Sequence, residues 1–288
     1  MRRPWMTCHA VTTVIALLAT WLLRADAQTP QSRVATPRIY VFENGFIRGF
    51  DTKMFSLARD EVKEPGLIDV SYLVVHPKGT LQFDSGGISD SAFTPDGMPV
   101  TQGPMSAAKP LLPQLAAAGY KPSDISYFVL SHYHYDHTAN ANAFAASTWI
   151  VQKAERDAML GNPPQGSVQP AHYTALKNAK TRILDNEDYD VFGDGTVRLI
   201  AAPGHTPGHQ VLLVRLAKRG PVMLGGDLYH YPEERANARM PTIEFNAQQS
   251  GASRTKVEAL LKQTGAELWI EHDIATHAGL PKAPAYIE

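Results

Sequence analysis

The chain has 288 residues, of which 44% are hydrophobic and 19% are charged, and its formal net charge is −1. This length supplies ample apolar material for one large domain or two small ones, and the composition is ordinary for a globular protein. A near-zero net charge excludes a strong overall positive field, so we expect no nucleic-acid partner.

The first 27 residues have the features of a secretory signal peptide. Arg2 and Arg3 precede an uncharged apolar stretch over residues 11–23, and Ala25-Asp26-Ala27 fits an A-x-A cleavage site. The sequence therefore predicts a mature protein that starts near Gln28 and is exported, either to the periplasm or into the medium. It also predicts no stable membrane insertion after cleavage. Because the apolar stretch is short for a bilayer span, a retained anchor is the weaker alternative.

The chain's single cysteine, Cys8, lies inside this leader segment. The predicted mature chain therefore has neither a disulfide nor a thiol nucleophile.

Apolar and β-branched runs alternate with turn residues in the first half of the remaining chain. Pro77-Lys78-Gly79 is a turn signal between two such runs, and Gly119 is a helix-ending signal. The patterns predict, in chain order, a strand (38–46), a loop or short helix (47–67), a hairpin (70–75 and 80–84), a loop (85–102) and a helix (107–118).

The second half continues with strands and interspersed helices. This mixture favours a sandwich of sheets covered by helices over a simple parallel α/β sheet. The predicted elements are a strand (125–130), helix (139–145), strand (149–151), helix (153–160), three strands (197–201, 210–216 and 222–225), a helix (253–263) and a last strand (268–270).

Four potential metal ligands occur within six residues directly after the strand predicted over 125–130. They are His132, His134, Asp136 and His137. Imidazole and carboxylate together suit divalent metals such as zinc. In an extended chain alternate side chains point the same way, so His132 and His134 can converge on one ion. The alternative is a polar surface cluster at the end of a strand.

Three further polar residues follow other predicted strands. His205 comes after residues 197–201, Asp227 lies two residues beyond the run 222–225, and His272 lies two residues beyond the last strand. A lone histidine at any of these places is more often structural than functional. Active-site groups nevertheless tend to come from the ends of several strands, so the set predicts one shared site.

The order of these histidines and aspartates along the chain resembles that of the metallo-β-lactamase superfamily. Asp84, the His132-x-His134-x-Asp136-His137 element, His205, Asp227 and His272 carry the resemblance. It implies a single domain over residues 28–288 with an α/β (α+β type) fold, an αββα sandwich of two mixed sheets flanked by helices.

The resemblance also implies a role for each of these residues. A first ion would be held by His132, His134 and His205, a second by Asp136, His137 and His272, and Asp227 would bridge them. Asp84 and His209 would lie behind the ligands, Asp84 to orient them and His209 in a similar or purely structural role. Two zinc ions per chain are implied, with Mn, Fe or Co as alternatives.

Such a pair of ions supports hydrolysis without a protein nucleophile. Two ions that share a water lower its pKa, so that hydroxide is available near neutral pH. Asp136 could then accept the proton and pass it to the leaving group. A serine hydrolase is disfavoured, because the chain has no Gly-x-Ser-x-Gly element.

Within the superfamily the chain is most similar to the quorum-quenching N-acyl-homoserine lactonases. Residues 131–137, 203–210 and 271–273 carry this resemblance. It implies that a metal-bridging hydroxide opens the ring of an N-acyl-homoserine lactone or a similar small molecule. Two alternatives stay open. One is another hydrolase of this fold, acting on a β-lactam, thioester, aryl ester or organophosphate. The other is a non-catalytic protein that binds a metal or ligand.

The chain departs from the lactonase pattern in two places. Residues 138–142 read Thr-Ala-Asn-Ala-Asn where the family usually has Gly-Gly-Asn, and His230 stands where a substrate-contacting Tyr is common. Its neighbours Tyr229 and Tyr231 are also hydrogen-bond donors, so each of the three is a candidate for contacting substrate or for packing. We take Asp136, His230 and Tyr229 as catalytic candidates. Residues 40–55 and 85–102 could line an apolar wall for an acyl chain, or simply pack in the core and on the surface.

Overall fold

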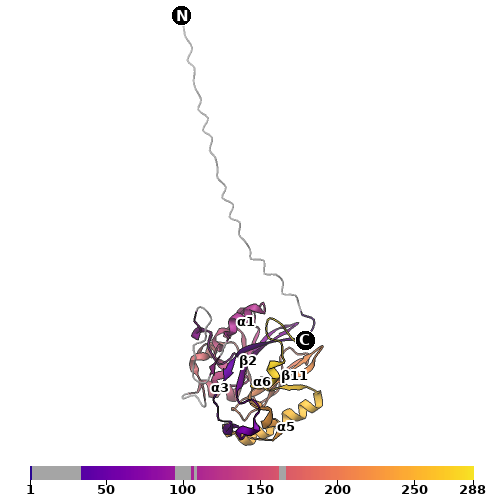
Figure 1. Cartoon of the computed structure of the whole chain (residues 1–288). Helices are drawn as coiled ribbons and strands as arrows, with labels where there is room; N and C mark the ends of the chain where they lie inside the picture. Colours follow the sequence, from indigo (N-terminus) through magenta and orange to yellow (C-terminus); the bar gives the residue numbers. More distant parts are fainter. Residues whose placement is uncertain (2–33, 95–104, 107–108, 162–166) are drawn as a thin grey trace. The chain divides into compact units, whose positions relative to one another are not determined.

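The computed structural model of the chain describes Met1 and residues 34–94, 105–106, 109–161 and 167–288 (Figure 1). Val34–Glu288 forms one compact unit, distinct from Met1–Arg33. The predicted signal peptide therefore lies outside the described residues, apart from Met1. None of the helices in the described part of the chain is long and apolar enough to cross a membrane.

The first sheet has seven strands, in the order β4-β1-β2-β3-β5-β6-β7. Neighbours from β4 to β3 pair antiparallel, and neighbours from β3 to β7 pair parallel, so the sheet is mixed. The predicted hairpin is present, as β2 and β3. The strands are β1 (Arg38–Ile47), β2 (Leu67–His76), β3 (Gly79–Phe83), β4 (Met105–Ser106), β5 (Tyr127–Val129), β6 (Thr148–Gln152) and β7 (Thr181–Leu184).

The second sheet has five strands, in the order β12-β11-β10-β9-β8. It is also mixed, because β11 and β12 pair parallel whereas the other neighbours pair antiparallel. Its strands are β8 (Tyr189–Asp190), β9 (Val197–Ala201), β10 (Gln210–Leu216), β11 (Gly220–Leu224) and β12 (Glu267–Trp269).

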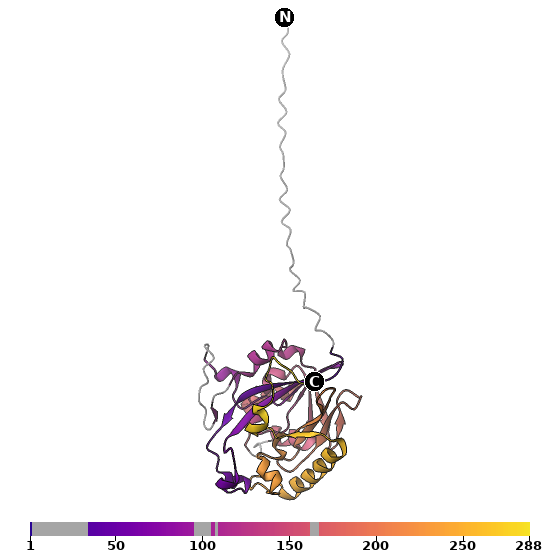
Figure 2. The ribbon, with the colours of Figure 1, turned by 45° about the vertical axis from the view of Figure 1, so that its right-hand side comes forward.

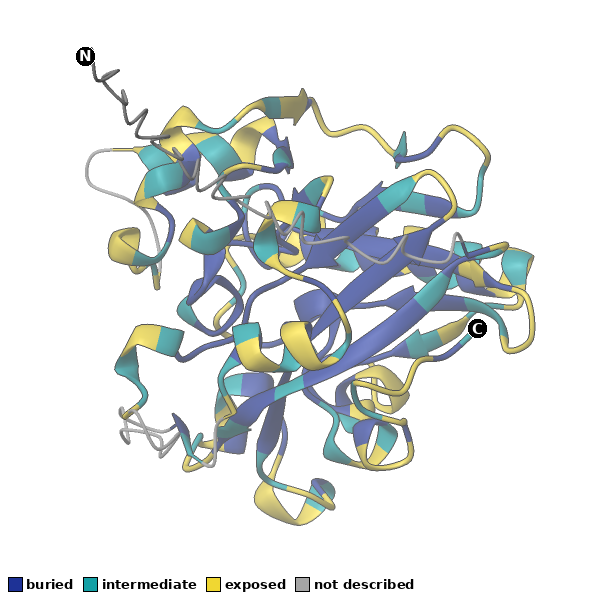
Figure 3. Ribbon diagram, turned by 90° about the horizontal axis from the view of Figure 1, so that it is seen from above, coloured by how far each residue is buried: buried dark blue, intermediate teal, exposed yellow. Residues whose placement is uncertain are grey.

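The two sheets pack face to face over a shared apolar core. Alternate residues of each strand point into it, such as Val70 and Tyr72 from β2 and Leu212 and Val214 from β10. The strands at the centre are buried along their length, whereas the helices expose their outer faces (Figure 3). Because apolar side chains alternate along each strand, each sheet has an apolar face, and packing the two sheets together buries both faces.

Helices cover the outer face of each sheet. The first sheet carries α1 (Leu111–Ala117) and α3 (Lys153–Leu160), whose Leu115 and Met159 belong to the same apolar cluster as Phe42. The second carries α5 (Ala247–Thr264), which packs Val257 and Leu261 against it and lies along its outside in Figure 2. This helix–sheet–sheet–helix arrangement confirms the predicted αββα sandwich.

The remaining helical segments are short and lie between strands or, for the last of them, after the final strand. The three α-helices and eight 3₁₀ turns among the described residues are α2 (Tyr135–Thr138), α4 (Pro232–Ala236), α6 (Ile274–Ala278), η1 (Thr52–Phe55), η2 (Arg59–Glu61), η3 (Asp90–Ala92), η4 (Pro122–Asp124), η5 (Ala141–Phe144), η6 (Pro170–His172), η7 (Thr174–Asn178) and η8 (Gly226–Leu228).

Three predicted helices differ from the structure. The helix expected over 253–263 is longer and begins at Ala247, where the Asn246 side chain accepts the N–H of Gln249. The helix expected from residue 107 starts at Leu111, because the extended backbone of Pro110 ends the preceding segment and the carboxylate of Asp90 caps the N–H groups of Leu111 and Leu112. Residues 107–108 lie outside the described residues. The helix expected over 139–145 is the 3₁₀ turn η5.

Candidate metal centre

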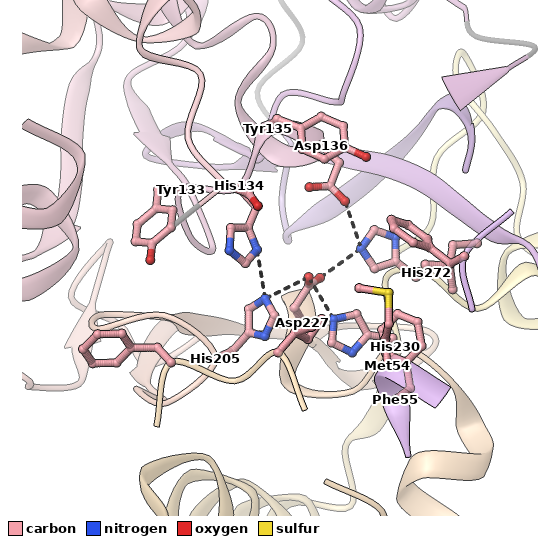
Figure 4. Close-up of a pocket in the computed structure, with 15 residues that line it drawn as sticks. Met54, Phe55, Tyr133, His134, Tyr135, Asp136, His205, Asp227, His230 and His272 are labelled. Carbon is pink, nitrogen blue, oxygen red and sulfur yellow. Dashed lines mark hydrogen bonds and ion pairs between the residues drawn. The ribbon is translucent and has the colours of Figure 1, made fainter. Parts of the chain in front are cut away.

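One edge of the sandwich collects the seven residues that the sequence suggested as ligands. The segment with His132, His134, Asp136 and His137 follows β5 and runs into α2. The other three sit beyond β9, β11 and β12, so the ends of four strands position the whole set, much of which is visible in Figure 4. These three are His205, Asp227 and His272.

Four of these residues form a first group of donors. Nδ1 of His134 lies 2.9 Å from Nε2 of His132 and 3.1 Å from Nε2 of His205. Oδ2 of Asp227 lies 3.4 Å from the His132 Nε2 and 3.2 Å from the His205 Nε2. The four donor atoms thus surround one point within 4.8 Å of one another.

The second group lies on the other side of the same carboxylate. Oδ1 of Asp227 is 3.2 Å from Nε2 of His137 and 3.0 Å from Nε2 of His272. The Asp136 carboxylate stands further out, with Oδ1 4.0 Å from the His137 Nε2 and Oδ2 3.8 Å from the His272 Nε2. Each oxygen of Asp227 therefore faces a different group of imidazoles.

These donors fit divalent metal ions. Nε2 of His137, Nε2 of His272 and Oδ1 of Asp227 are buried and have no hydrogen-bond partner among the described residues, although they converge on one another. Buried polar atoms without partners are costly unless something satisfies them. A mixed set of imidazole and carboxylate donors is typical of zinc and related divalent metals.

The electrostatics differ between the donor groups and favour the unprotonated, metal-binding form at His132, His134 and Asp227. Burial holds the pKa of His132 and of His134 well below the usual value. Burial acts to lower the pKa of His137, of His205 and of His272, but the Asp227 carboxylate raises the pKa of each above its usual value. Burial acts to raise the pKa of Asp227, but the surrounding imidazoles, first His272 and then His137, bring it well below the usual value. The carboxylate is therefore ionised and able to act as a ligand.

Several ligand histidines have a second polar contact on the ring nitrogen that faces away from the centre. Nδ1 of His137 lies 3.2 Å from Oδ2 of Asp84 and also 3.2 Å from Oε1 of Glu271. Nδ1 of His205 lies 3.3 Å from Oε1 of Glu244. Contacts of this kind orient a ligating ring. Asp84 thus lies where the sequence suggested, whereas Glu244 and Glu271 were not singled out. The only sequence feature that could have indicated Glu271 is its position directly before His272.

His209 lies outside both donor groups and holds Asp227 in place from behind. Its Nε2 accepts a hydrogen bond from the backbone N–H of Asp227 at 3.1 Å, and its Nδ1 donates to the Ala202 carbonyl at 3.1 Å. Burial lowers the pKa of His209 to about 3, which keeps the ring neutral, as this pair of bonds requires. The residue therefore has a supporting position.

A buried carboxylate that the sequence did not reveal joins the two segments bearing His132, His134 and His205. Oε1 of Glu155 accepts the Tyr133 N–H at 2.7 Å, and Oε2 accepts the Thr206 hydroxyl and the Gly208 N–H, each at 2.8 Å. Burial raises the pKa of Glu155 to about 7, against these three donors. No local motif marks this residue, because its partners are 22 to 53 positions away.

The three adjacent aromatic candidates after Asp227 point in different directions. His230 faces the site, with Nε2 3.2 Å from Oδ2 of Asp227. The Tyr229 hydroxyl instead donates to Glu258 at 3.2 Å, and the Tyr231 hydroxyl donates to the Pro65 carbonyl. Tyr229 was therefore wrongly included among the catalytic candidates, because its side chain packs away from the centre.

A pocket of 450 Å³ opens over the two donor groups and has mainly apolar walls. The apolar side chains that line it include Phe50, Met54, Phe55, Ile243 and Phe245. The predicted wall from residues 40–55 is thus present in part, whereas residues 85–94 do not line the pocket and residues 95–102 lie outside the described residues. His134, Asp136, His205, Asp227, His230 and His272 bring their polar groups to the same cavity (Figure 4).

Fold, donor groups and pocket together define a metal-dependent hydrolase scaffold. Residues 66–268 match the family described as the metallo-beta-lactamase superfamily. The chain belongs to that superfamily.

Relatives within the superfamily include lactonases. N-acyl homoserine lactonase AttM of Azorhizobium caulinodans is 30% identical over 75% of this chain and 86% of its own length. An N-acyl homoserine lactonase of a Bacillus species is 33% identical over 60% of this chain and 66% of the relative.

Solved structures share the fold. A quorum-quenching N-acyl homoserine lactone lactonase superposes with a TM-score of 0.73 at 24% identity, covering 88% of this chain and 100% of the other. AidC, described as a dizinc quorum-quenching lactonase in complex with a product, superposes with a TM-score of 0.60 at 21% identity, covering 87% and 92%.

Proposed function

We propose that this protein is a dinuclear metallohydrolase that opens the ring of N-acyl homoserine lactones or closely similar lactones, with zinc as the metal. The observation that carries the proposal is the position of Asp227, whose two oxygens face separate groups of imidazoles at the floor of an apolar pocket. The relatives named as N-acyl homoserine lactonases support the same substrate class.

The residues divide between two ions in this proposal. His132, His134 and His205 would hold one ion, Asp136, His137 and His272 the other, and Asp227 both. When bound, such a pair of ions supplies a water of lowered pKa and polarises the substrate carbonyl. Lactone opening then needs no covalent intermediate with the protein.

The protein's own groups complete the reaction. The Asp136 carboxylate borders the pocket and is placed to take up the proton of the attacking water and return it to the leaving alkoxide. Nε2 of His230 faces the same cavity and can bind the substrate's lactone or amide oxygen. The walls formed by Phe50, Phe55 and Phe245 would bury the acyl chain and keep bulk solvent out of the cavity.

We further propose that the mature protein is exported. The support is the leader-like pattern of residues 1–27, with its arginine pair, apolar stretch and A-x-A site. Expression in a Gram-negative host with N-terminal sequencing tests this. A periplasmic or secreted product that starts near Gln28 is expected, and a cytoplasmic product with an intact N-terminus would contradict it.

A substrate panel on the zinc-loaded protein tests the proposed activity. We expect about two metal ions per chain, by elemental analysis, and the highest kcat/KM on an N-acyl homoserine lactone compared with a β-lactam, a thioester, an aryl ester and an organophosphate. Asp227→Ala should lower metal content and reduce kcat/KM by about a thousandfold. Asp185→Ala removes an exposed carboxylate and serves as the control. Full metal loading without lactone turnover would refute the proposal.

A further inference from the structure

A buried ion pair lies directly behind His230, on the side away from the pocket. Oε1 of Glu234, in α4, is 3.2 Å from both Nδ1 and the backbone N of His230. The contact with the ring is an ion-pair contact without the alignment of a hydrogen bond. Glu234 is fully buried, so its carboxylate has no solvent to compensate its charge.

Arg254 in α5 compensates that charge and anchors the carboxylate. Its Nη2 lies 3.1 Å from Oε2 of Glu234, and its Nε donates to the Leu228 carbonyl at 2.9 Å. The guanidinium also stacks over the Tyr229 ring, with Cζ 4.3 Å from the centroid. Arg254 is thus held at several points, and Glu234 can move little relative to α5.

The His230 ring is confined on its other sides as well. The Phe55 ring lies against it, with centroids 4.6 Å apart, and the His272 ring stacks parallel at 6.0 Å. An imidazole can present either nitrogen to a ligand, so which one faces the pocket depends on what holds the other. Here Nδ1 faces Glu234 and Nε2 faces the pocket beside Asp227.

We propose that Glu234, anchored by Arg254, is a positioning residue that fixes the orientation of His230 and directs Nε2 toward the substrate. This inference rests on the proposed lactonase function. The buried pair Glu234–Arg254 would then do more than join α4 to α5. The surface pair Arg235–Glu258 also joins these two helices. That second pair does not contact His230 and supplies a matched control.

A double-mutant cycle separates positioning from a purely structural role. Glu234→Gln keeps the shape of the side chain and should lower kcat/KM for the lactone about tenfold, a loss typical of groups that orient active-site residues. In a His230→Ala background the same change should lower kcat/KM less than about twofold, because the ring it acts on is gone. Equal losses in both backgrounds would overturn the inference.

A spectroscopic readout follows the ring itself without any reaction. The ¹⁵N–¹H correlation spectrum of the histidine rings in the metal-free protein should show changed His230 signals in Glu234→Gln and unchanged ones in Arg235→Gln. The second variant breaks the surface pair and leaves the Tyr229 hydroxyl its Glu258 acceptor. His230→Ala identifies the signals. His230 signals that are the same in wild type and in Glu234→Gln would overturn the positioning role.

Wild-type turnover separates the failure of this inference from that of the function. A wild-type protein that opens no lactone refutes the proposed function, and this inference with it. Lactone turnover together with equal losses in both backgrounds refutes the inference alone.

Discussion

At the scale of single residues, buried side chains outside the two donor groups determine where the candidate ligands lie. His209 holds the backbone of Asp227, and Glu155 joins the segment of Tyr133 to the turn that carries His205. A buried acceptor that serves three donors is hard to replace. If one of these buried donors loses its partner, no water can take the partner's place.

Glu155→Gln tests this joining role. An amide offers one oxygen and one NH₂ group where the carboxylate accepts three hydrogen bonds, so at least one donor would be left facing another donor. We expect a loss of about 1–3 kcal/mol in the free energy of unfolding and a metal affinity about 10 to 100 times weaker. Urea denaturation and metal titration measure the two effects.

Asp157→Asn is the control on the same helix. Among the described residues its exposed carboxylate pairs only with Lys153 on the surface, so the free energy of unfolding should change by less than about 0.5 kcal/mol. Similar losses in both variants would show that the contacts of Glu155 are not responsible.

At the scale of elements, the turn after β9 is shaped by its contact with α5. Gly204 has φ +139°, and a Cβ there would lie 2.2 Å from the backbone N of Ser250 at the start of that helix. The turn and the helix can approach this closely only because residue 204 has no side chain. The position of His205 therefore depends on the contact between its neighbour Gly204 and Ser250 of α5, which lies 46 positions further along the chain.

Gly204→Ala should separate this turn from α5. The clash with Ser250 and the unfavourable φ together predict a loss of at least about 2 kcal/mol in the free energy of unfolding, together with weaker metal binding. Gly251→Ala, within α5, meets only Met240 Cε at 3.9 Å and should instead stabilise by about 0.5–1 kcal/mol. If denaturation shows no difference between the variants, the contact does not constrain the turn.

At the scale of the whole described unit, a buried histidine links elements from both sheets. Nε2 of His277 in α6 lies 3.2 Å from the Tyr72 hydroxyl on β2 and 3.2 Å from the carbonyl of Ile270, which follows β12. Burial, assisted by Lys282, lowers the pKa of His277 to about 3. The folded protein therefore holds this ring neutral, and charging it opposes folding.

The sign of the pH dependence follows from these values. Between the unfolded pKa of about 6.5 and the folded pKa of about 3, the unfolded chain binds the extra proton. The contribution of His277 is complete above pH 6.5 and is lost by about 1.4 kcal/mol per pH unit as the pH falls. In urea denaturation of metal-free protein, the stability difference between wild type and His277→Gln should shrink at that rate.

Above pH 6.5 the same difference should be constant, because His277 is neutral in both states. A difference that does not change between pH 7.5 and pH 4.5 would contradict the lowered pKa.

Most of the fold could be predicted from local patterns, and the exceptions have physical causes. The hairpin of β2 and β3 and the helix α3 follow from periodicity and turn residues alone. The two-residue strands β4 and β8 exist only through pairing with a neighbour, so no local pattern marks them. The start of α1 depends on Asp90, a capping residue that is distant in the sequence.

The amino-acid sequence by itself predicted which residues come together at the candidate metal centre, because histidines and aspartates after apolar strands have a recognisable spacing. Only the tertiary structure decided how they are used. It turns Tyr229 away and His230 inward, gives each oxygen of Asp227 its own imidazoles, and places Glu234 behind the ring. These relations depend on how two sheets and their helices pack, and packing brings together side chains that no local pattern connects.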